Sequence, residues 1–210
     1  MTRLMLQEWK RLYRFSLALG GVVLMAGFLP QSTQAGVFNT SRFVMPSQFA
    51  FGLEPSILLA SGSGLSANLR MTYGLNELMN VQAIVGQGSG RHQFRGGGGM
   101  VFDFFPDHEN QPGIGIAANA QYMQITDGSR GEVVATPYIH KAIFTESSEI
   151  DPFFALPIGA RFESGASNLI ASLALGTVIK TSENMHWVVE LGVAVNRTSS
   201  YFSGGFVFYN

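Results

Sequence analysis

Two ionisable residues near the C-terminus have a spacing that could support chemistry. His186 and Glu190 lie four positions apart, so on an extended strand both side chains would point to the same face. With a nearby serine, such a pair could form a hydrolytic set in which the imidazole activates the hydroxyl. No second motif supports that set, and a histidine paired or solvated inside the protein explains it better. We therefore predict no catalytic residues and expect that the protein is not an enzyme.

A glycine-rich stretch offers a second candidate site. It contains Gly86-x-Gly88-x-Gly90 and the four-glycine run Gly96 to Gly99. Such loops bind phosphate where a helix N-terminus follows them, but no helical periodicity follows here. Glycines within strands more often permit a bend or the close packing of a large neighbour. The four histidines lack the spacing of a metal site, and we predict no metal and no cofactor.

The composition of the 210-residue chain narrows the class of protein. Hydrophobic residues make up 46% and charged residues only 13%, which argues against a disordered chain. The absence of cysteine excludes disulfide scaffolds and thiol catalysis. The length suits one domain.

The first thirty-five residues resemble a secretory signal peptide. Basic residues such as Arg3 and Arg14 precede an uncharged apolar run from Phe15 to Leu29, and small residues lead to a predicted cleavage after Ala35. Removing residues 1–35 takes four of the 13 basic and one of the 14 acidic residues, which leaves 9 and 13 and a formal charge of −4. We therefore expect no nucleic-acid partner.

From Gln48 onward, apolar residues recur with a period of two. Between Gly64 and Gly74 the odd positions are apolar and the even positions polar, as in a strand with two different faces. Most of the predicted strands are longer than those of globular sheets and close to the length of membrane-spanning strands. The predicted strands are 48–60, 64–74, 79–88, 92–105, 113–126, 131–144, 152–163, 168–180, 184–197 and 200–209.

Short polar turns join these strands, which predicts an all-β, closed, antiparallel up-and-down transmembrane barrel over residues 48–210. We expect about ten strands, with eight as the alternative, and a periplasmic extension over residues 36–47. Closure removes both sheet edges, and it is obligatory in lipid. A soluble lipocalin-like barrel would show the same alternation with its apolar face turned inward, so the pattern leaves both open. The phase of strand 131–144 stays open as well.

Aromatic residues on the apolar face gather at the two predicted rims, as expected at the two membrane–water interfaces. A smaller upper set comprises Phe94, Tyr122, Phe162 and Phe202. The predicted lower girdle comprises Phe49, Phe51, Tyr73, Phe102, Phe104, Phe154, Trp187, Phe206 and Phe208.

Charged residues on the polar face have balanced signs. A charge facing lipid near the midplane costs about 2–4 kcal/mol for Arg or Lys, so these residues are expected to face the lumen. We predict an ion-paired interior, with a small gated passage as the alternative. The predicted lumen charges are Glu54, Arg70, Arg95, Asp103, Arg161, Glu163, Lys180 and Glu190.

These features resemble the small outer-membrane β-barrels of Gram-negative bacteria, the OmpA-like barrel group in the broad sense. The resemblance rests on the signal segment, the strand lengths, the turn Tyr73-Gly-Leu-Asn-Glu-Leu78 and the aromatic last strand, Phe202 to Tyr209. It implies a monomer in the outer membrane, with membrane lipids and the barrel-assembly machinery as partners. The chain departs from the group by ending in Asn210 rather than an aromatic residue.

The expected function is a structural, membrane-stabilising one with an ion-paired lumen. A narrow passive channel for small solutes or ions is the alternative. A lipid-modifying barrel enzyme and a soluble lipocalin-like binding protein are less favoured readings of the same pattern.

Overall fold

The computed structural model describes residues 43–59, 64–89, 92–108, 111–125, 128–145, 148–163 and 165–210. The predicted signal segment 1–35 and residues 36–42 of the predicted extension lie outside the described residues. Within the described ranges, no helix has the length and apolar character needed to cross a membrane.

Strands account for most of the described residues, and their bounds follow the alternating pattern of the sequence. In chain order they are β1 (Phe49–Leu58), β2 (Leu65–Asn76), β3 (Met79–Gly88), β4 (His92–Phe105), β5 (Gly113–Ile125), β6 (Gly128–His140), β7 (Ile143–Phe144), β8 (Glu149–Ala155), β9 (Ile158–Glu163), β10 (Ala166–Lys180), β11 (Met185–Asn196) and β12 (Tyr201–Tyr209).

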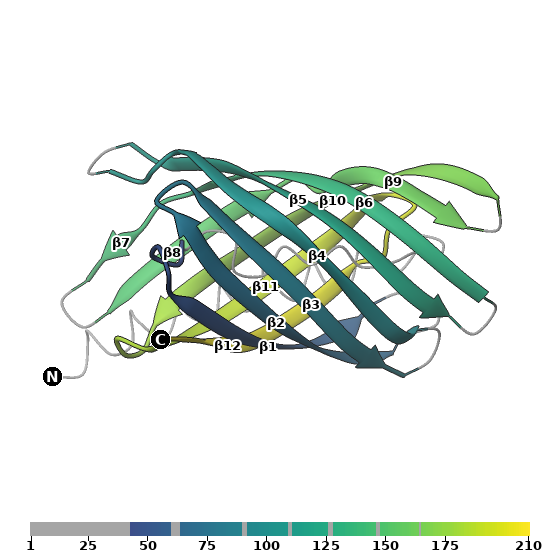
Figure 1. The fold of residues 1–210 in the computed structure, drawn as a ribbon, viewed down its shortest axis with the longest axis horizontal. Helices are drawn as coiled ribbons and strands as arrows, with labels where there is room; N and C mark the ends of the chain where they lie inside the picture. The colour runs from purple at the N-terminus through teal and green to yellow at the C-terminus, as the bar shows by residue number, and fades with distance from the viewer. Residues whose placement is uncertain are drawn as a thin grey trace, which may run out of the picture.

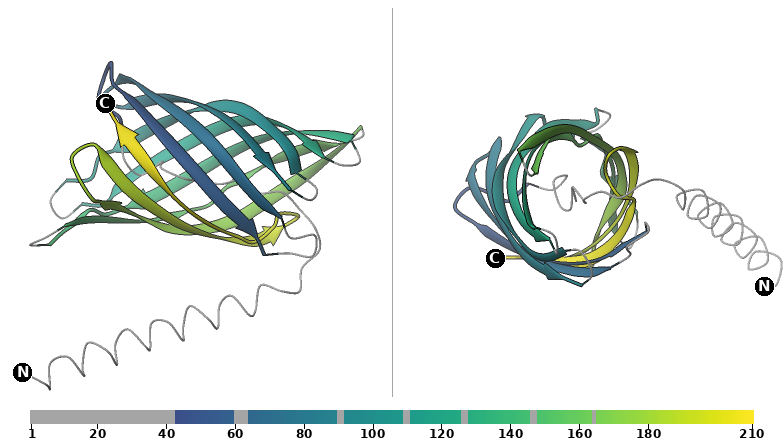
Figure 2. Two further views of the ribbon diagram at one scale, coloured as in Figure 1. Left: turned by 90° about the horizontal axis from the view of Figure 1, so that it is seen from below. Right: turned by 90° about the vertical axis from the view of Figure 1, so that its right-hand side faces the viewer.

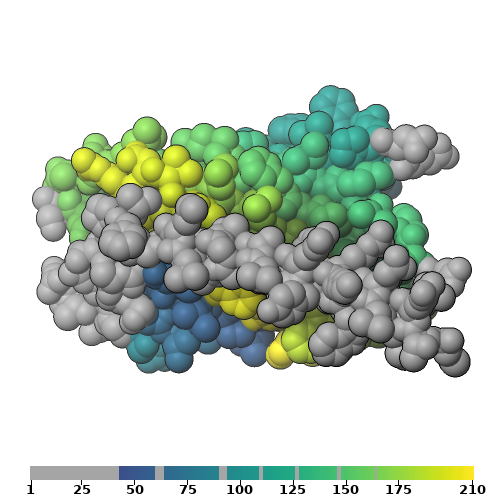
Figure 3. Space-filling model, turned by 180° about the vertical axis from the view of Figure 1, so that it is seen from behind, coloured from purple at the N-terminus to yellow at the C-terminus, as the bar shows by residue number. Residues whose placement is uncertain are grey.

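The strands form one antiparallel sheet that closes on itself where β12 pairs with β1. The strands cross the long axis obliquely (Figure 1), and the view along that axis shows a closed ring (Figure 2). From behind, atoms of β1 in blue adjoin atoms of β12 in yellow (Figure 3). The predicted closed, ten-strand antiparallel barrel is confirmed.

The barrel has ten positions in its wall although twelve strands are assigned, because β8 and β9 share one position. Both pair with β6 on one side and with β10 on the other. The break between them falls at Leu156 and Pro157, where Pro157 has no N–H to donate to the ladder. β7 pairs only with the start of β8 and lies outside the ring. The single strand predicted over 152–163 is therefore divided, and its predecessor ends at His140 rather than at 144.

The two ends of the barrel differ in what they carry. We call the end at which β1 begins and β12 ends the terminal end. It also carries the β2–β3, β4–β5, β6–β8 and β10–β11 connections. The opposite end, with the β1–β2 and β11–β12 connections among others, is called the far end.

A short segment before β1, residues 43–47, packs against the terminal end and is called the strap. Pro46 forms a parallel bridge with Gly74, and the Ser47 N–H donates to the Gly74 carbonyl at 2.8 Å. Val44 is almost fully buried among inward-facing apolar side chains, which form a layer inside the barrel. This apolar layer comprises Val44, Ala50, Val101, Ala117, Tyr138, Phe153, Ala155, Ala174, Val178, Val188 and Val207.

Candidate functional site

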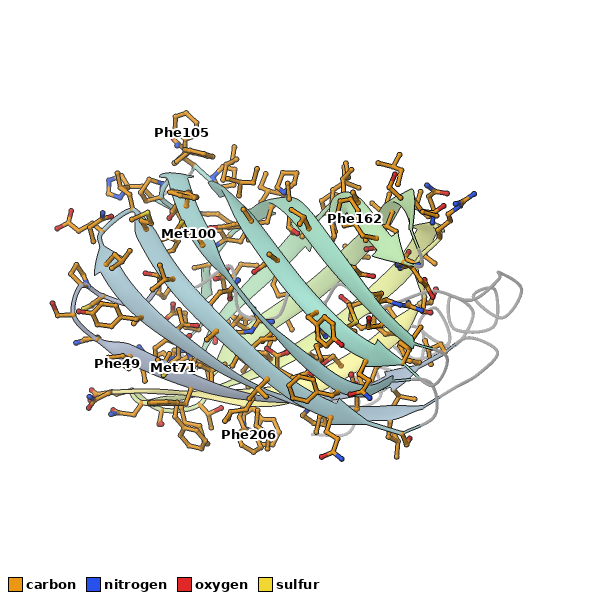
Figure 4. The ribbon with its side chains drawn as sticks, turned by 45° about the vertical axis from the view of Figure 1, so that its right-hand side comes forward. Phe49, Met71, Met100, Phe105, Phe162 and Phe206 are labelled. Carbon is orange, nitrogen blue, oxygen red and sulfur yellow. The ribbon has the colours of Figure 1, made fainter. Side chains whose placement is uncertain are left out.

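The outer face of the barrel is mostly apolar. Leu53, Leu69 and Val85 are exposed, whereas the alternate residues in their strands are buried. Side chains such as Met71, Met100 and Phe162 point away from the wall (Figure 4). No outward-facing position of the described strands carries a charged residue. This arrangement is inverted relative to a soluble protein, in which apolar side chains occupy the dry interior.

The residues of the predicted lower girdle gather toward the terminal end of β1, β2, β4, β8, β11 and β12. Phe49 and Tyr73 are opposite each other, with ring centroids 4.6 Å apart. Trp187 meets Phe206 edge to face at 5.6 Å. Phe104 differs from a regular outward position, because the ladder is irregular between Asp103 and Phe105 and both Phe104 and Phe105 are exposed. The upper set, Phe94, Tyr122, Phe162 and Phe202, is also exposed on the outer face.

The inner face carries a chain of buried polar contacts that crosses the first strands. The Arg70 guanidinium donates from Nε to the Glu54 carboxylate and from Nη1 to Gln82 Oε1, the latter at 2.6 Å. Gln82 Nε2 then donates to Asn119 Oδ1 at 2.6 Å. Because a buried ion pair is stable only when hydrogen bonds satisfy its remaining atoms, the two amides complete this cross-link.

A second group of contacts links β4 with β5, β6 with β9, and β11 with β12. Arg161 Nε donates to Glu132 Oε1 at 2.7 Å, and the two residues face each other directly across the β6–β9 ladder. Arg95 Nε donates to Gln121 Oε1 at 2.5 Å, and the Tyr201 hydroxyl donates to the Glu190 carboxylate. All these side chains are buried, so the middle of the lumen is filled by paired groups.

All eight predicted lumen charges face inward, but they do not form one cluster. One ion pair joins two of them, Arg70 with Glu54. Glu163 lies near the far end with Arg130 at 3.4 Å, and Lys180 lies at the terminal end with Glu149 at 3.5 Å. Asp103 also lies at the terminal end.

Sequence reasoning missed five inward ionisable residues: Arg130, Glu132, His140, Glu149 and Asp151. Three of them belong to β6, whose phase alternation alone does not settle. The signal that could have settled it is charge, since Arg130 and Glu132 share one parity and neither can face lipid. Lys141 obscured that signal with its opposite parity, but it follows the last residue of the strand.

His186 and Glu190 share the inner face without contacting each other in any described interaction. On an extended strand, residues four apart are separated by about 13 Å. The His186 ring lies 4.6 Å from the Tyr209 ring in the terminal half, while Glu190 accepts from Tyr201 toward the far end. The structure therefore does not bring the two residues together as a hydrolytic pair.

Inward glycines create the space that large lumen side chains occupy. A Cβ placed on Gly192 would lie 1.9 Å from the Tyr201 ring, and one on Gly176 would lie 2.3 Å from the Phe153 ring. A Cβ on Gly113 would likewise meet the His140 ring, and one on Gly115 would meet the Tyr138 ring. These glycines allow aromatic rings to pack close to the wall.

The terminal end holds a polar mouth beside the strap. His140 Nδ1 lies 3.0 and 3.2 Å from the two carboxylate oxygens of Asp151. Asp107, in the β4–β5 connection, accepts from Lys141 Nζ at 2.5 Å and from the Ala142 N–H at 2.6 Å. Burial alone would raise the pKa of Asp107, but these two hydrogen bonds and the lysine charge hold that pKa below its usual range. A cavity of about 420 Å³ lies among these groups.

Several buried polar atoms of the inner face have no hydrogen-bond partner. They include Arg70 Nη2, Arg95 Nη2, Asp103 Oδ1 and His140 Nε2. Buried polar atoms are nearly always satisfied by protein or water, so these positions call for water or a ligand inside the barrel. Near the far end, a small cavity of about 20 Å³ lies beside Arg95, Asn68 and Ser66, and is large enough for a single water molecule.

No protein-family model and no curated protein matches this chain. Among solved structures, it is similar to a de novo designed transmembrane β-barrel, with 7% identity and a TM-score of 0.41 over 79% of this chain and 97% of that one. It is similar to a bacterial polysaccharide outer membrane secretin, with 11% identity and a TM-score of 0.48 over 78% of this chain and 65% of that one. It is also similar to an outer membrane channel from Pseudomonas putida F1, with 6% identity and a TM-score of 0.45 over 84% of this chain and all of that one, 100%. Similarities at this level carry no information on activity or substrate.

Proposed function

We propose that this protein is an integral outer-membrane β-barrel with a structural, membrane-stabilising role and a filled, ion-paired lumen. One observation carries the proposal: outward strand positions are uncharged and mostly apolar, while the ionised groups of the strands face inward. In water, a continuous exposed apolar belt would drive aggregation. In lipid, the same belt is favourable, and the closed ladder pairs the backbone of each strand with its neighbours on both sides.

The proposal extends to location and partners. The basic and apolar first 35 residues would direct export, and the barrel-assembly machinery of a Gram-negative cell would insert the chain as a monomer of the OmpA-like kind. The membrane lipids would contact the aromatic rims. We assign no catalytic role, and His186→Ala is expected to leave the lipid A mass profile of the host unchanged.

Trp187 provides the test of membrane insertion, because it is 46% exposed on the outer face and Trp9 is the only other tryptophan. In full-length Trp9→Phe protein folded into vesicles, we expect blue-shifted emission that lipids brominated on their acyl chains quench strongly. Iodide in the water should quench it weakly. Emission typical of water, quenched by iodide but not by brominated lipid, would overturn the proposal.

Cell fractionation and gel migration test location and closure together. The protein is expected to partition with the outer membrane, to require detergent for extraction, and to migrate faster on a denaturing gel when it is not boiled. Extraction by salt alone would favour the soluble lipocalin-like alternative.

A narrow passive channel is the second candidate function, and the unpartnered polar atoms along the inner face favour it. If water enters the lumen between the polar groups, the apolar layer around Val44 would still oppose the passage of ions. Val44→Gly should then raise single-channel conductance in a planar bilayer. A bilayer that stays silent with both the native protein and Val44→Gly would support the filled barrel.

A further inference from the structure

The mouth at the terminal end is a candidate binding site that neither the structural role nor the channel requires. Its cavity of about 420 Å³ lies between the strap, the β4–β5 connection and the start of β8. That volume falls within the range of small-molecule sites, about 300–1,000 Å³.

Four carboxylates line this cavity: Asp103, Asp107, Glu149 and Asp151. Three of them have cationic or imidazole partners, namely Lys141 for Asp107, Lys180 for Glu149 and His140 for Asp151. Asp103 has no such partner, so the fixed charges of the mouth are negative in sum. A complementary ligand would therefore be positively charged.

Asp103 is also the group whose geometry calls for a ligand. Its side chain belongs to a residue only 8% exposed, it lines the cavity, and its Oδ1 has no hydrogen-bond partner. His140 lines the same cavity and is equally buried, and its Nε2 has no partner either. Since Asp151 only accepts hydrogen bonds, the neutral imidazole carries its proton on Nδ1, and Nε2 is then an acceptor. Since a Cβ on Gly113 would lie 2.1 Å from His140 Nε2, that atom faces the wall, and Asp103 is the acceptor left for a ligand that donates hydrogen bonds.

The surroundings favour an organic cation over a bare metal ion. No group of three or more His, Asp or Glu residues in the described ranges is arranged to hold a metal. Two aromatic side chains instead line the cavity, Phe43 from the strap and Phe144 from β7. Phe144 is 77% exposed. Aromatic faces attract alkylammonium groups. We propose that this mouth binds a small primary alkylammonium compound, with Asp103 as its main anionic contact.

The test measures binding of 1,4-diaminobutane to the full-length protein in zwitterionic detergent by calorimetry. Asp103→Asn keeps the shape of the side chain and removes its charge, and it should weaken binding at least about tenfold, because a buried charge-assisted hydrogen bond is lost. Glu183→Gln is the matched control: it removes one negative charge from the exposed β10–β11 turn at the same end and should leave affinity unchanged.

A second variant and two other ligands test whether the cavity selects an organic cation. Phe144→Ala changes an exposed residue outside the ring and should weaken binding about two- to fivefold. Neutral 1,4-butanediol should not bind. Equal affinity of Asp103→Asn and native protein, a similar loss in Glu183→Gln, or tighter binding of Mg²⁺ than of the diamine would each overturn the proposal. Heat-modifiable migration of every variant in the same detergent separates these outcomes from failure of the barrel itself.

Discussion

The free-energy cost of breaking an ion pair in the lumen depends on how deeply that pair is buried. Glu132 and Arg161 are cross-strand neighbours with their side chains almost completely removed from solvent. Lys180 and Glu149 form a pair of the same kind at the terminal end, where the lysine side chain is about one third exposed. Water can solvate Lys180 when its partner is removed, but it cannot easily reach Arg161.

Glu132→Gln should therefore destabilise the barrel by about 3–5 kcal/mol, because it removes the carboxylate that pairs with the buried Arg161 guanidinium. Glu149→Gln should cost less than about 1 kcal/mol, because water can solvate the remaining Lys180 ammonium. The measurement is urea unfolding in lipid vesicles, followed by Trp187 fluorescence. Similar midpoint shifts for both variants would contradict this account of the lumen.

Gly192 offers a second test at the scale of single atoms. An added Cβ would meet the Tyr201 ring, so Gly192→Ala should displace that ring from Glu190 and cost about 1–3 kcal/mol. Gly204 faces outward on the neighbouring strand, where a Cβ has room. Gly204→Ala is the control and should change stability by less than about 1 kcal/mol in the same unfolding assay. A larger loss in Gly204→Ala than in Gly192→Ala would show that ring packing is not the cause.

At the scale of elements, the strands and their antiparallel order in the ring were predictable, but the side-chain contacts between them were not. The strand from Leu65 to Tyr73 can be recognised from its own residues, because apolar and polar side chains alternate along it. The pairing of Arg161 with Glu132 depends on the register between two strands about thirty residues apart, which no local pattern encodes. The break at Pro157 and the inward packing of Val44 likewise depend on the closed ring.

The strap can be tested through two adjacent residues with opposite environments. Val44 is buried in the apolar layer, whereas Met45 is 68% exposed. Val44→Asp would place an unpaired carboxylate among apolar side chains, at a cost of several kcal/mol, and should therefore release the strap. Limited proteolysis should then cut before Phe49 much faster than in native protein, while Met45→Asp should be cut at the native rate. Equal cutting of both variants would mean that Val44 does not hold the strap.

For the whole molecule, the decisive property is the inversion of polarity across the wall. In the proposed membrane barrel only the middle of a strand lies deep in lipid, so an outward arginine should cost more there than at the end of the strand. Leu69→Arg, at a position 50% exposed in mid-strand, should destabilise the protein in vesicles by about 2–4 kcal/mol. Leu75→Arg, near the end of the same strand, should cost about 0–1 kcal/mol.

The comparison is made by unfolding in vesicles of the same lipid. Equal costs at the two positions, or no cost at either, would remove the membrane from the explanation of the apolar belt.

The pairing of β1 with β12 suggests that the chain can be circularly permuted. The Asn210 N–H donates to the Phe49 carbonyl at 3.0 Å, so the start of the first strand and the end of the last one touch at the same rim. A few added residues could join them, and the covalent backbone would then follow the ring without interruption. New termini could be opened at any hairpin while every ladder stayed intact. In the closed ring, the pairing of the strands therefore does not depend on which strand comes first in the chain.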